Sequence, residues 1–60
     1  MYAFATFDKD GQEHSVYLGY NKAQWLSLSD KVKKAEVEAV VLSYDVDFET
    51  VFVTFEREYK

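Results

Sequence analysis

Apolar and polar residues alternate along the first twenty positions, which is the period of a β-strand. The segment Asp8-Lys9-Asp10-Gly11 interrupts the alternation and predicts a hairpin turn. Glycine accepts a left-handed backbone without a Cβ clash, so a three-residue loop that ends on Gly11 fits this segment. The pattern therefore predicts one strand over residues 1–7 and a second over residues 12–20, with a bulge at Gly19.

The length of the loop fixes which residues of the two strands face each other. A three-residue loop sets Asp8 opposite Gln12 and Phe4 opposite Val16. In that register, Tyr2 and Phe4 share the face that carries the core. The other face, not covered by the helix predicted below, then carries five apolar or aromatic side chains of the sheet: Ala3, Ala5, Phe7, Tyr17 and Phe52.

After Tyr20 the apolar spacing changes to three or four residues, which predicts a helix over residues 22–36. Asn21 is the expected N-cap, because Gln24 stands three residues later and completes a capping box. The apolar side of the helix consists of Trp25, Leu28, Val32, Ala35 and Ala39. Ser27 and Ser29 leave an alternative open, in which the helix breaks near Leu28 and a second helix begins at Asp30.

Two later segments, residues 37–46 and 50–59, are rich in β-branched residues with a period of two and predict two further strands. The last strand directs four side chains to the core face: Val51, Val53, Phe55 and Tyr59. The predicted fold is thus a single small α+β domain over residues 1–60, in the order strand-strand-helix-strand-strand. It has a four-stranded sheet with one helix on one face.

Composition limits the classes of function. The chain has 60 residues, no Cys, one His, 11 acidic and 7 basic residues, and a formal net charge of −4. These numbers argue against a disulfide framework, a thiolate metal site and binding to nucleic acid. No apolar run reaches the length of a membrane span, and residues 1–4 lack the order of a signal peptide, so we expect a cytoplasmic protein without membrane contact.

Little in the chain indicates catalysis. His14 is the only histidine, the residue type that most often serves as a general base, and no nucleophile stands in a recognisable motif. Asp45, Asp47 and Glu49 alternate between the last two predicted strands, where they could solvate the loop, contact a partner, imitate phosphates or gather a cation. Solvation is the simplest interpretation. We therefore expect no enzyme activity, no cofactor and no metal.

Aromatic residues are the better candidates for function. An uncovered apolar face is unusual for a monomer, so Phe7, Tyr17 and Phe52 are expected to contact a protein partner or a second copy in a homodimer. Trp25 is either the core anchor of the helix or an exposed interface residue. Phe52-Val53-Thr54-Phe55 is similar to the end of an RNA-recognition motif, which leaves an RNA-binding sheet as an alternative.

The chain is small and acidic, has no Cys or Pro, and opens in the order strand-strand-helix, with Lys22-Ala23-Gln24-Trp25 at the helix start. In these features it resembles small bacteriophage-encoded inhibitors of host enzymes, such as the T-even phage antitoxins. The resemblance implies a non-catalytic protein that occludes a host enzyme, such as a nuclease or toxin. Leu26-Ser27-Leu28-Ser29-Asp30 is similar to a segment of phage inhibitors of uracil-DNA glycosylase, which act as DNA mimics. An acidic DNA mimic is therefore the alternative function, with Asp45, Asp47 and Glu49 in place of phosphates.

Overall fold

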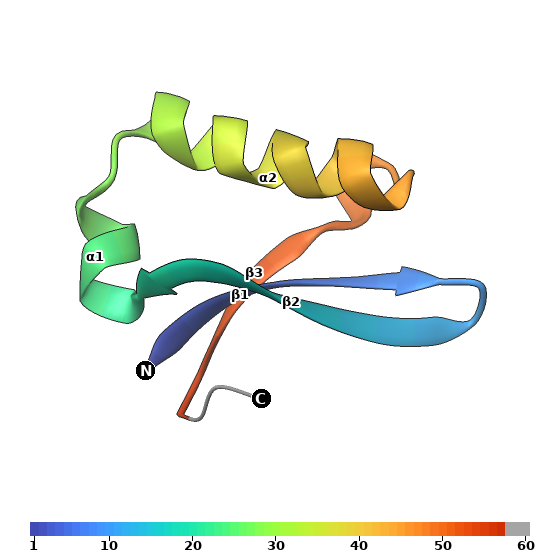
Figure 1. Cartoon of the computed structure of the whole chain (residues 1–60), viewed down its shortest axis with the longest axis horizontal. Coiled ribbons are helices and arrows are strands. Elements are labelled where there is room, and N and C mark those ends of the chain that lie inside the picture. Colours follow the sequence, from blue (N-terminus) through green and yellow to red (C-terminus); the bar gives the residue numbers. More distant parts are fainter. Residues whose placement is uncertain (58–60) are drawn as a thin grey trace.

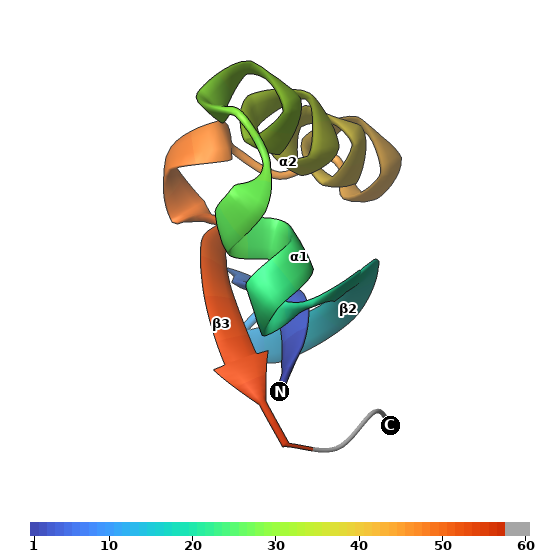
Figure 2. The ribbon, with the colours of Figure 1, turned by 90° about the vertical axis from the view of Figure 1, so that its left-hand side faces the viewer.

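Three antiparallel strands and two helices make up the computed structural model, which describes residues 1–57 (Figure 1). The elements in chain order are β1 (Tyr2–Lys9), β2 (Gln12–Asn21), α1 (Lys22–Ser27), α2 (Asp30–Tyr44), a 3₁₀ helix (Phe48–Thr50) and β3 (Phe52–Glu56). The sheet order is β2-β1-β3, so β1 is the central strand. Figure 2 shows α1 and α2 on the same side of this sheet.

The hairpin between β1 and β2 turns over two residues. Asp10 and Gly11 both have positive φ, 54° and 76°, as a type I′ turn requires. Lys9 therefore faces Gln12, and the predicted three-residue loop, with Asp8 opposite Gln12, is wrong by one residue. Aspartate tolerates the left-handed region better than most side chains, which is why Asp10 can occupy the first turn position.

The one-residue shift reverses the faces predicted for β1. Ala3, Ala5 and Phe7 are buried at 0%, 0% and 2% exposure and pack against the helices, so they do not form an open apolar patch. The opposite face of β1 carries Phe4, which is 3% exposed and contacts the Tyr17 ring with a centroid distance of 5.7 Å. The prediction for β3 is confirmed for Val51, Val53 and Phe55, which pack against the helix-side core, whereas Tyr59 lies outside the described residues.

Residues 30–44 form one long helix where the sequence suggested a strand over residues 37–46. Val37 and Val40 are its buried residues, and they lie three positions apart on the face that meets the sheet. The segment has no Gly or Pro to end a helix, and its Ala and Glu residues favour one, so packing of the Val side chains overrides their β-propensity. The described sheet consequently has three strands, and the predicted four-stranded sheet is wrong.

Side-chain caps fix the starts of both helices. The Asn21 side chain accepts a hydrogen bond from the Gln24 backbone N–H at 2.8 Å, and the Gln24 side chain accepts one from the Asn21 N–H at 2.9 Å. This capping box is the one that the sequence predicts. Ser29 caps α2 by accepting from the Val32 N–H at 3.3 Å, so the alternative with a break near Leu28 is confirmed.

The capping box supplies a test of the local structure. Asn21→Ala should lower the free energy of unfolding by about 1 kcal/mol, because the first turn of α1 loses the acceptor for one of its backbone donors. Urea denaturation followed by circular dichroism measures the change. Asn21→Asp keeps the acceptor and serves as the control. Equal urea midpoints for Asn21→Ala and the parent protein would contradict the stabilising role of the cap.

Candidate functional site

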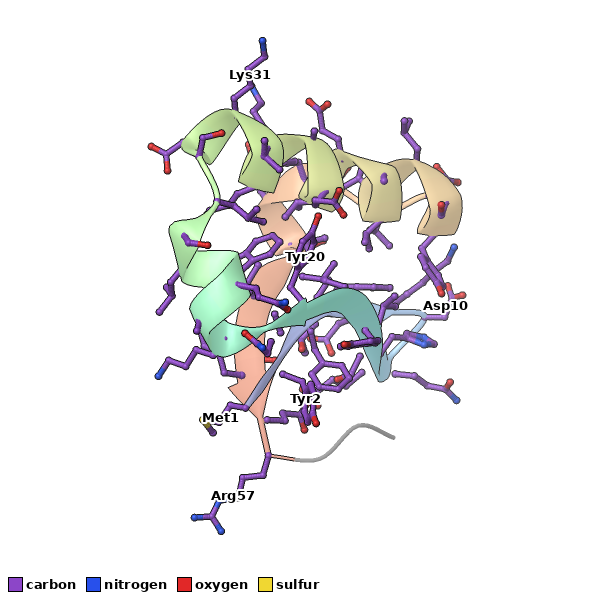
Figure 3. All side chains as sticks on the ribbon, turned by 60° about the vertical axis from the view of Figure 1, so that its left-hand side comes forward. Met1, Tyr2, Asp10, Tyr20, Lys31 and Arg57 are labelled. Carbon is purple, nitrogen blue, oxygen red and sulfur yellow. The ribbon has the colours of Figure 1, made fainter. Side chains whose placement is uncertain are left out.

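The sheet face that points away from the helices is the surface on which the predicted aromatic contacts can be assessed. Figure 3 shows Tyr2 on this side of the sheet and Tyr20 on the side of the helices. Because cross-strand partners share a face, the register places Tyr17 beside Phe4, and Phe52 beside Thr6. This face, called the open sheet face, carries ten side chains of the three strands: Tyr2, Phe4, Thr6, Asp8, Glu13, Ser15, Tyr17, Phe52, Thr54 and Glu56.

Aromatic rings occupy two parts of the open sheet face. Tyr2 and Tyr17 meet edge to face with ring centroids 6.0 Å apart, and they are 38% and 37% exposed. Phe52 is 66% exposed at the start of β3. The face therefore presents rigid aromatic surface from three different strands, and the sequence prediction for Tyr17 and Phe52 holds as far as their exposure is concerned.

Hydroxyl groups separate these rings at the centre of the face. Thr6 Oγ1 lies 2.9 Å from Thr54 Oγ1 and 3.4 Å from Ser15 Oγ. The face is thus a mixture of aromatic and hydroxyl groups, where the sequence suggested a continuous apolar patch. Such a mixture is typical of surfaces that bind another protein and also stay soluble alone.

Acidic side chains flank Phe52. A shallow depression of about 220 Å³ beside this ring is lined by Thr6, Phe7, Asp8, Glu13, Thr50 and Phe52. Asp8 and Glu13 are cross-strand partners at the hairpin end of the sheet, and both are exposed. The exposed ring therefore stands next to negative charge.

Two predicted contact residues lie in the core. Phe7 is 2% exposed, and its ring contacts those of His14 and Tyr44 at 5.4 and 5.3 Å. Trp25 is 4% exposed and contacts Tyr20 at 5.8 Å, so its interpretation as the core anchor is correct. Neither side chain is available on the surface to a partner. Phe7 was predicted on the uncovered face because the predicted register is wrong by one residue. For Trp25 the sequence left two interpretations open, a core anchor and an exposed interface residue.

The acidic residues after α2 do not form an extended row. Asp45 ends α2 in the left-handed conformation, with φ 53° and ψ 53°. Asp47 precedes the 3₁₀ helix, where its carbonyl oxygen accepts hydrogen bonds from the N–H and Oγ1 of Thr50, and Glu49 lies inside that helix. All three acids are exposed. Their spacing in the chain is therefore not their spacing on the surface.

The hairpin tip and the end of α2 lie against each other. The Lys9 ammonium donates a hydrogen bond to the Tyr44 carbonyl oxygen. Val46 packs on the core cluster of Ala5, Phe7 and Val40. Asp10 is consequently brought to the same end of the molecule as Asp45. Sequence spacing gave no sign of this acidic end, because the two segments are more than thirty positions apart in the chain.

Residues 1–57 contain no group of three or more His, Asp or Glu side chains placed to hold a metal ion. His14 stacks on Phe7 with an angle of 22° between the rings, as a strand residue of the helix-side face. Within the same residues, no helix is long and apolar enough to cross a bilayer.

A second exposed apolar area lies on α2 and was missed by the sequence prediction. Leu42 and Phe48 are 83% and 44% exposed. Together with Lys34, Glu38 and Val41 they line a shallow depression of about 600 Å³ between α2 and the 3₁₀ helix. A helical interpretation of residues 37–46 would have shown Leu42 on the side away from Val37 and Val40, but the β-branched pattern concealed it.

Comparisons with protein-family models, with curated proteins and with solved structures found no match to this chain. The function is therefore inferred from the surface alone.

Proposed function

We propose that this chain is a non-catalytic protein-binding module that occludes a partner enzyme, such as a host nuclease or toxin. The observation that carries the proposal is Phe52, an aromatic ring 66% exposed on the open sheet face beside Asp8 and Glu13. Buried aromatic anchors surrounded by a polar rim dominate the affinity of many protein interfaces. A sheet also holds such an anchor rigidly, which lowers the entropy lost on binding.

The charge around Phe52 indicates the kind of partner. Enzymes that act on RNA or DNA carry basic surfaces that neutralise phosphates. The acidic flank of the open sheet face would attract such a surface, and Phe52 would then supply apolar contact at its centre. These two properties together support occlusion of a nuclease or of a toxin that acts on nucleic acid.

An acidic DNA mimic is the second candidate, and one observation favours it. The contact between the Lys9 ammonium at the hairpin tip and the Tyr44 carbonyl oxygen places Asp10 and Asp45 at the same end of the molecule. In a mimic, these charges would carry most of the affinity. An RNA-binding sheet has less support, because the ten residues of the open sheet face include three acids and neither Lys nor Arg.

Affinity capture from a bacterial lysate, followed by titration of the captured protein, tests the proposal. We expect Phe52→Ser to weaken binding by about 30-fold or more, because it removes the aromatic anchor. Leu42→Ser is the matched control, since it removes an even more exposed apolar side chain from the other apolar area, and it should bind like the parent protein. Unchanged binding by Phe52→Ser would contradict occlusion through the open sheet face.

The same titration separates the two candidates. A triple variant with Asp45→Asn, Asp47→Asn and Glu49→Gln should mainly slow association and reduce its salt dependence if occlusion is the mechanism. Complete loss of binding by this variant would favour the DNA mimic. Turnover of a substrate that depends on His14 would contradict both candidates.

A further inference from the structure

Strand β2 lies at one edge of the sheet, and only one side of β2 is paired, with β1, among the described strands. The register between β1 and β2 is unbroken from Gln12 to Tyr17. In a hairpin with a two-residue turn, the residues that flank the turn exchange both backbone hydrogen bonds, and such pairs alternate along the strands. Gln12, His14 and Val16 therefore direct their backbone groups to β1, whereas Glu13 and Ser15 direct theirs away from the described sheet.

A groove runs along this edge beneath α2. It has a volume of about 560 Å³ and is lined by Val16, Tyr17, Leu18, Glu36, Ala39, Val40, Ser43 and Tyr44. Val16 and Leu18 are half-buried and pack on the core cluster of Ala5, Phe7 and Val40. Ala39 and Ser43 are short and exposed, so α2 leaves room beside the edge strand. The groove is lined by both apolar and polar side chains, Glu36 and Ser43 among the polar ones. Backbone donors and acceptors beside such a groove are the chemistry that recognises an added β-strand.

The two ends of this edge carry opposite charge. β2 runs away from the hairpin tip toward Lys22, and α2 runs back above it, as Figure 1 shows. The start of α2 carries one acid, Asp30, followed by Lys31, Lys33 and Lys34, and its end is followed by Asp45. At the hairpin end, Asp8, Asp10 and Glu13 outnumber the single cation Lys9. The hairpin end of the molecule is therefore acidic and the α1 end is basic, and Figure 3 shows Asp10 and Lys31 at these separate ends.

From these features we infer that the added strand is β2 of a second copy of this chain, paired antiparallel. Antiparallel pairing directs the acidic hairpin end of each copy toward the basic α1 end of the other, whereas parallel pairing would set acid beside acid. The two three-stranded sheets would become one continuous sheet. The charge pattern thus fits the reversed strand of an identical chain, so a second copy is the occupant that the edge of β2 favours.

The spacing of the elements permits this dimer. The two-fold axis of an antiparallel strand pair is perpendicular to the sheet, so both α2 helices lie on the same side. Neighbouring strands are about 4.8 Å apart, and α2 packs on residues of both β1 and β2 through Val40. At Val40, where α2 lies above the gap between these strands, the helix would be about 5 Å from the axis, and the two helices would be about 10 Å apart there, within the range at which helices pack. Val37 belongs instead to the cluster that contains Ala3 of β1, so the helices would be closest near Val40. Both open sheet faces remain uncovered by the pairing, so the inference does not rest on the proposed function.

Sedimentation equilibrium tests the dimer in the absence of any other protein. We expect the mass to rise from 7.0 kDa toward twice that value as the concentration increases from about 10 µM to about 1 mM, the range of weak interfaces. Ser15→Pro should raise the dissociation constant by about 30-fold or more, because proline removes an outward N–H and blocks strand addition. Ser15→Ala keeps the N–H and is the control, which should associate like the parent protein.

A pair of helix variants keeps the test decisive if Ser15→Pro is unfolded. Ala39→Arg places a long charged side chain in the groove and should also dissociate the dimer, whereas Leu42→Arg makes a comparable change on the other exposed side of α2 and should not. Circular dichroism checks that each variant is folded. A parent protein that stays monomeric at about 1 mM, or dissociation by Leu42→Arg and not by Ala39→Arg, would overturn the inference.

The direction of the strands can be measured separately, since the chain contains no Cys. The Gln12→Cys variant, carrying a nitroxide and no ¹⁵N, is mixed with ¹⁵N-labelled parent protein that carries no nitroxide. The nitroxide should broaden the amide signals of residues 18–22 in the ¹⁵N-labelled copy more than those near Gln12. The strongest broadening at Gln12 itself would show parallel pairing and contradict the antiparallel dimer.

Discussion

Phe7→Ala is expected to lower the free energy of unfolding by about 3 to 5 kcal/mol, as large-to-small changes in a core do. A domain of this size has only about 3 to 5 kcal/mol of stability to lose, so most molecules should be unfolded. Phe7 is the largest fully buried side chain of the described residues, and its ring joins His14 of β2 to Tyr44 of α2. Circular dichroism at increasing urea concentration measures the effect.

Phe52→Ala is the matched control for this prediction. The same atoms are removed, but the Phe52 side chain is 66% exposed, so its truncation leaves no cavity and should change stability by about 0.5 kcal/mol or less. If the two variants lost equal stability, the faces of β1 and β3 in this structure would be wrong.

Trp25→Ala should have a comparable effect, a loss of about 3 to 5 kcal/mol. Trp25 is the one buried residue of the six-residue helix α1, and it packs in the cluster that contains Ala3 of β1 and Val37 of α2. Its loss would therefore detach α1 and open the core at that end. The measurement is a thermal melt followed by circular dichroism, because the variant no longer contains the tryptophan on which fluorescence depends.

The neighbouring residue provides the control for Trp25. Leu26 is 57% exposed in the same short helix, and Leu26→Ala should melt within a few degrees of the parent protein. A Trp25→Ala variant that kept the parental melting temperature would instead mean that α1 contributes little to the core.

The hairpin shows what the sequence could and could not specify. Asp10-Gly11 between alternating segments predicts a turn, and a turn is there. The sequence did not decide between a two-residue and a three-residue loop, because aspartate accepts either the right-handed or the left-handed region at its position. This choice shifts the register by one residue, and a shift of one residue exchanges the core and open faces. The placement of Phe7 depended on it.

The second half of the chain shows a competition between local preference and packing. The β-branched residues of 37–46 favour a strand, yet Val37 and Val40 reach the sheet together only when the segment is helical. The capping signals at Asn21 and Ser29 were stronger guides, because a hydrogen bond between nearby residues depends little on tertiary context. On the candidate site, the exposure of Tyr17 and Phe52 was predictable from strand alternation, whereas Leu42 required knowledge of the helix.

The place of β1 at the centre of the sheet has a consequence for the newly made chain. Its two neighbours are available at very different times, because β2 follows after a two-residue turn and β3 follows only after both helices. Thr6 and Thr54, which share a hydrogen bond across β1 and β3, are 48 positions apart. While a ribosome is still adding the intervening residues, the hairpin exposes the side of β1 that β3 later covers, and the apolar side chains of the helices lack the Val51, Val53 and Phe55 surface on which they pack. A partly synthesised chain is therefore open to contact with chaperones and to aggregation at this strand until residues 52–56 have been joined to it.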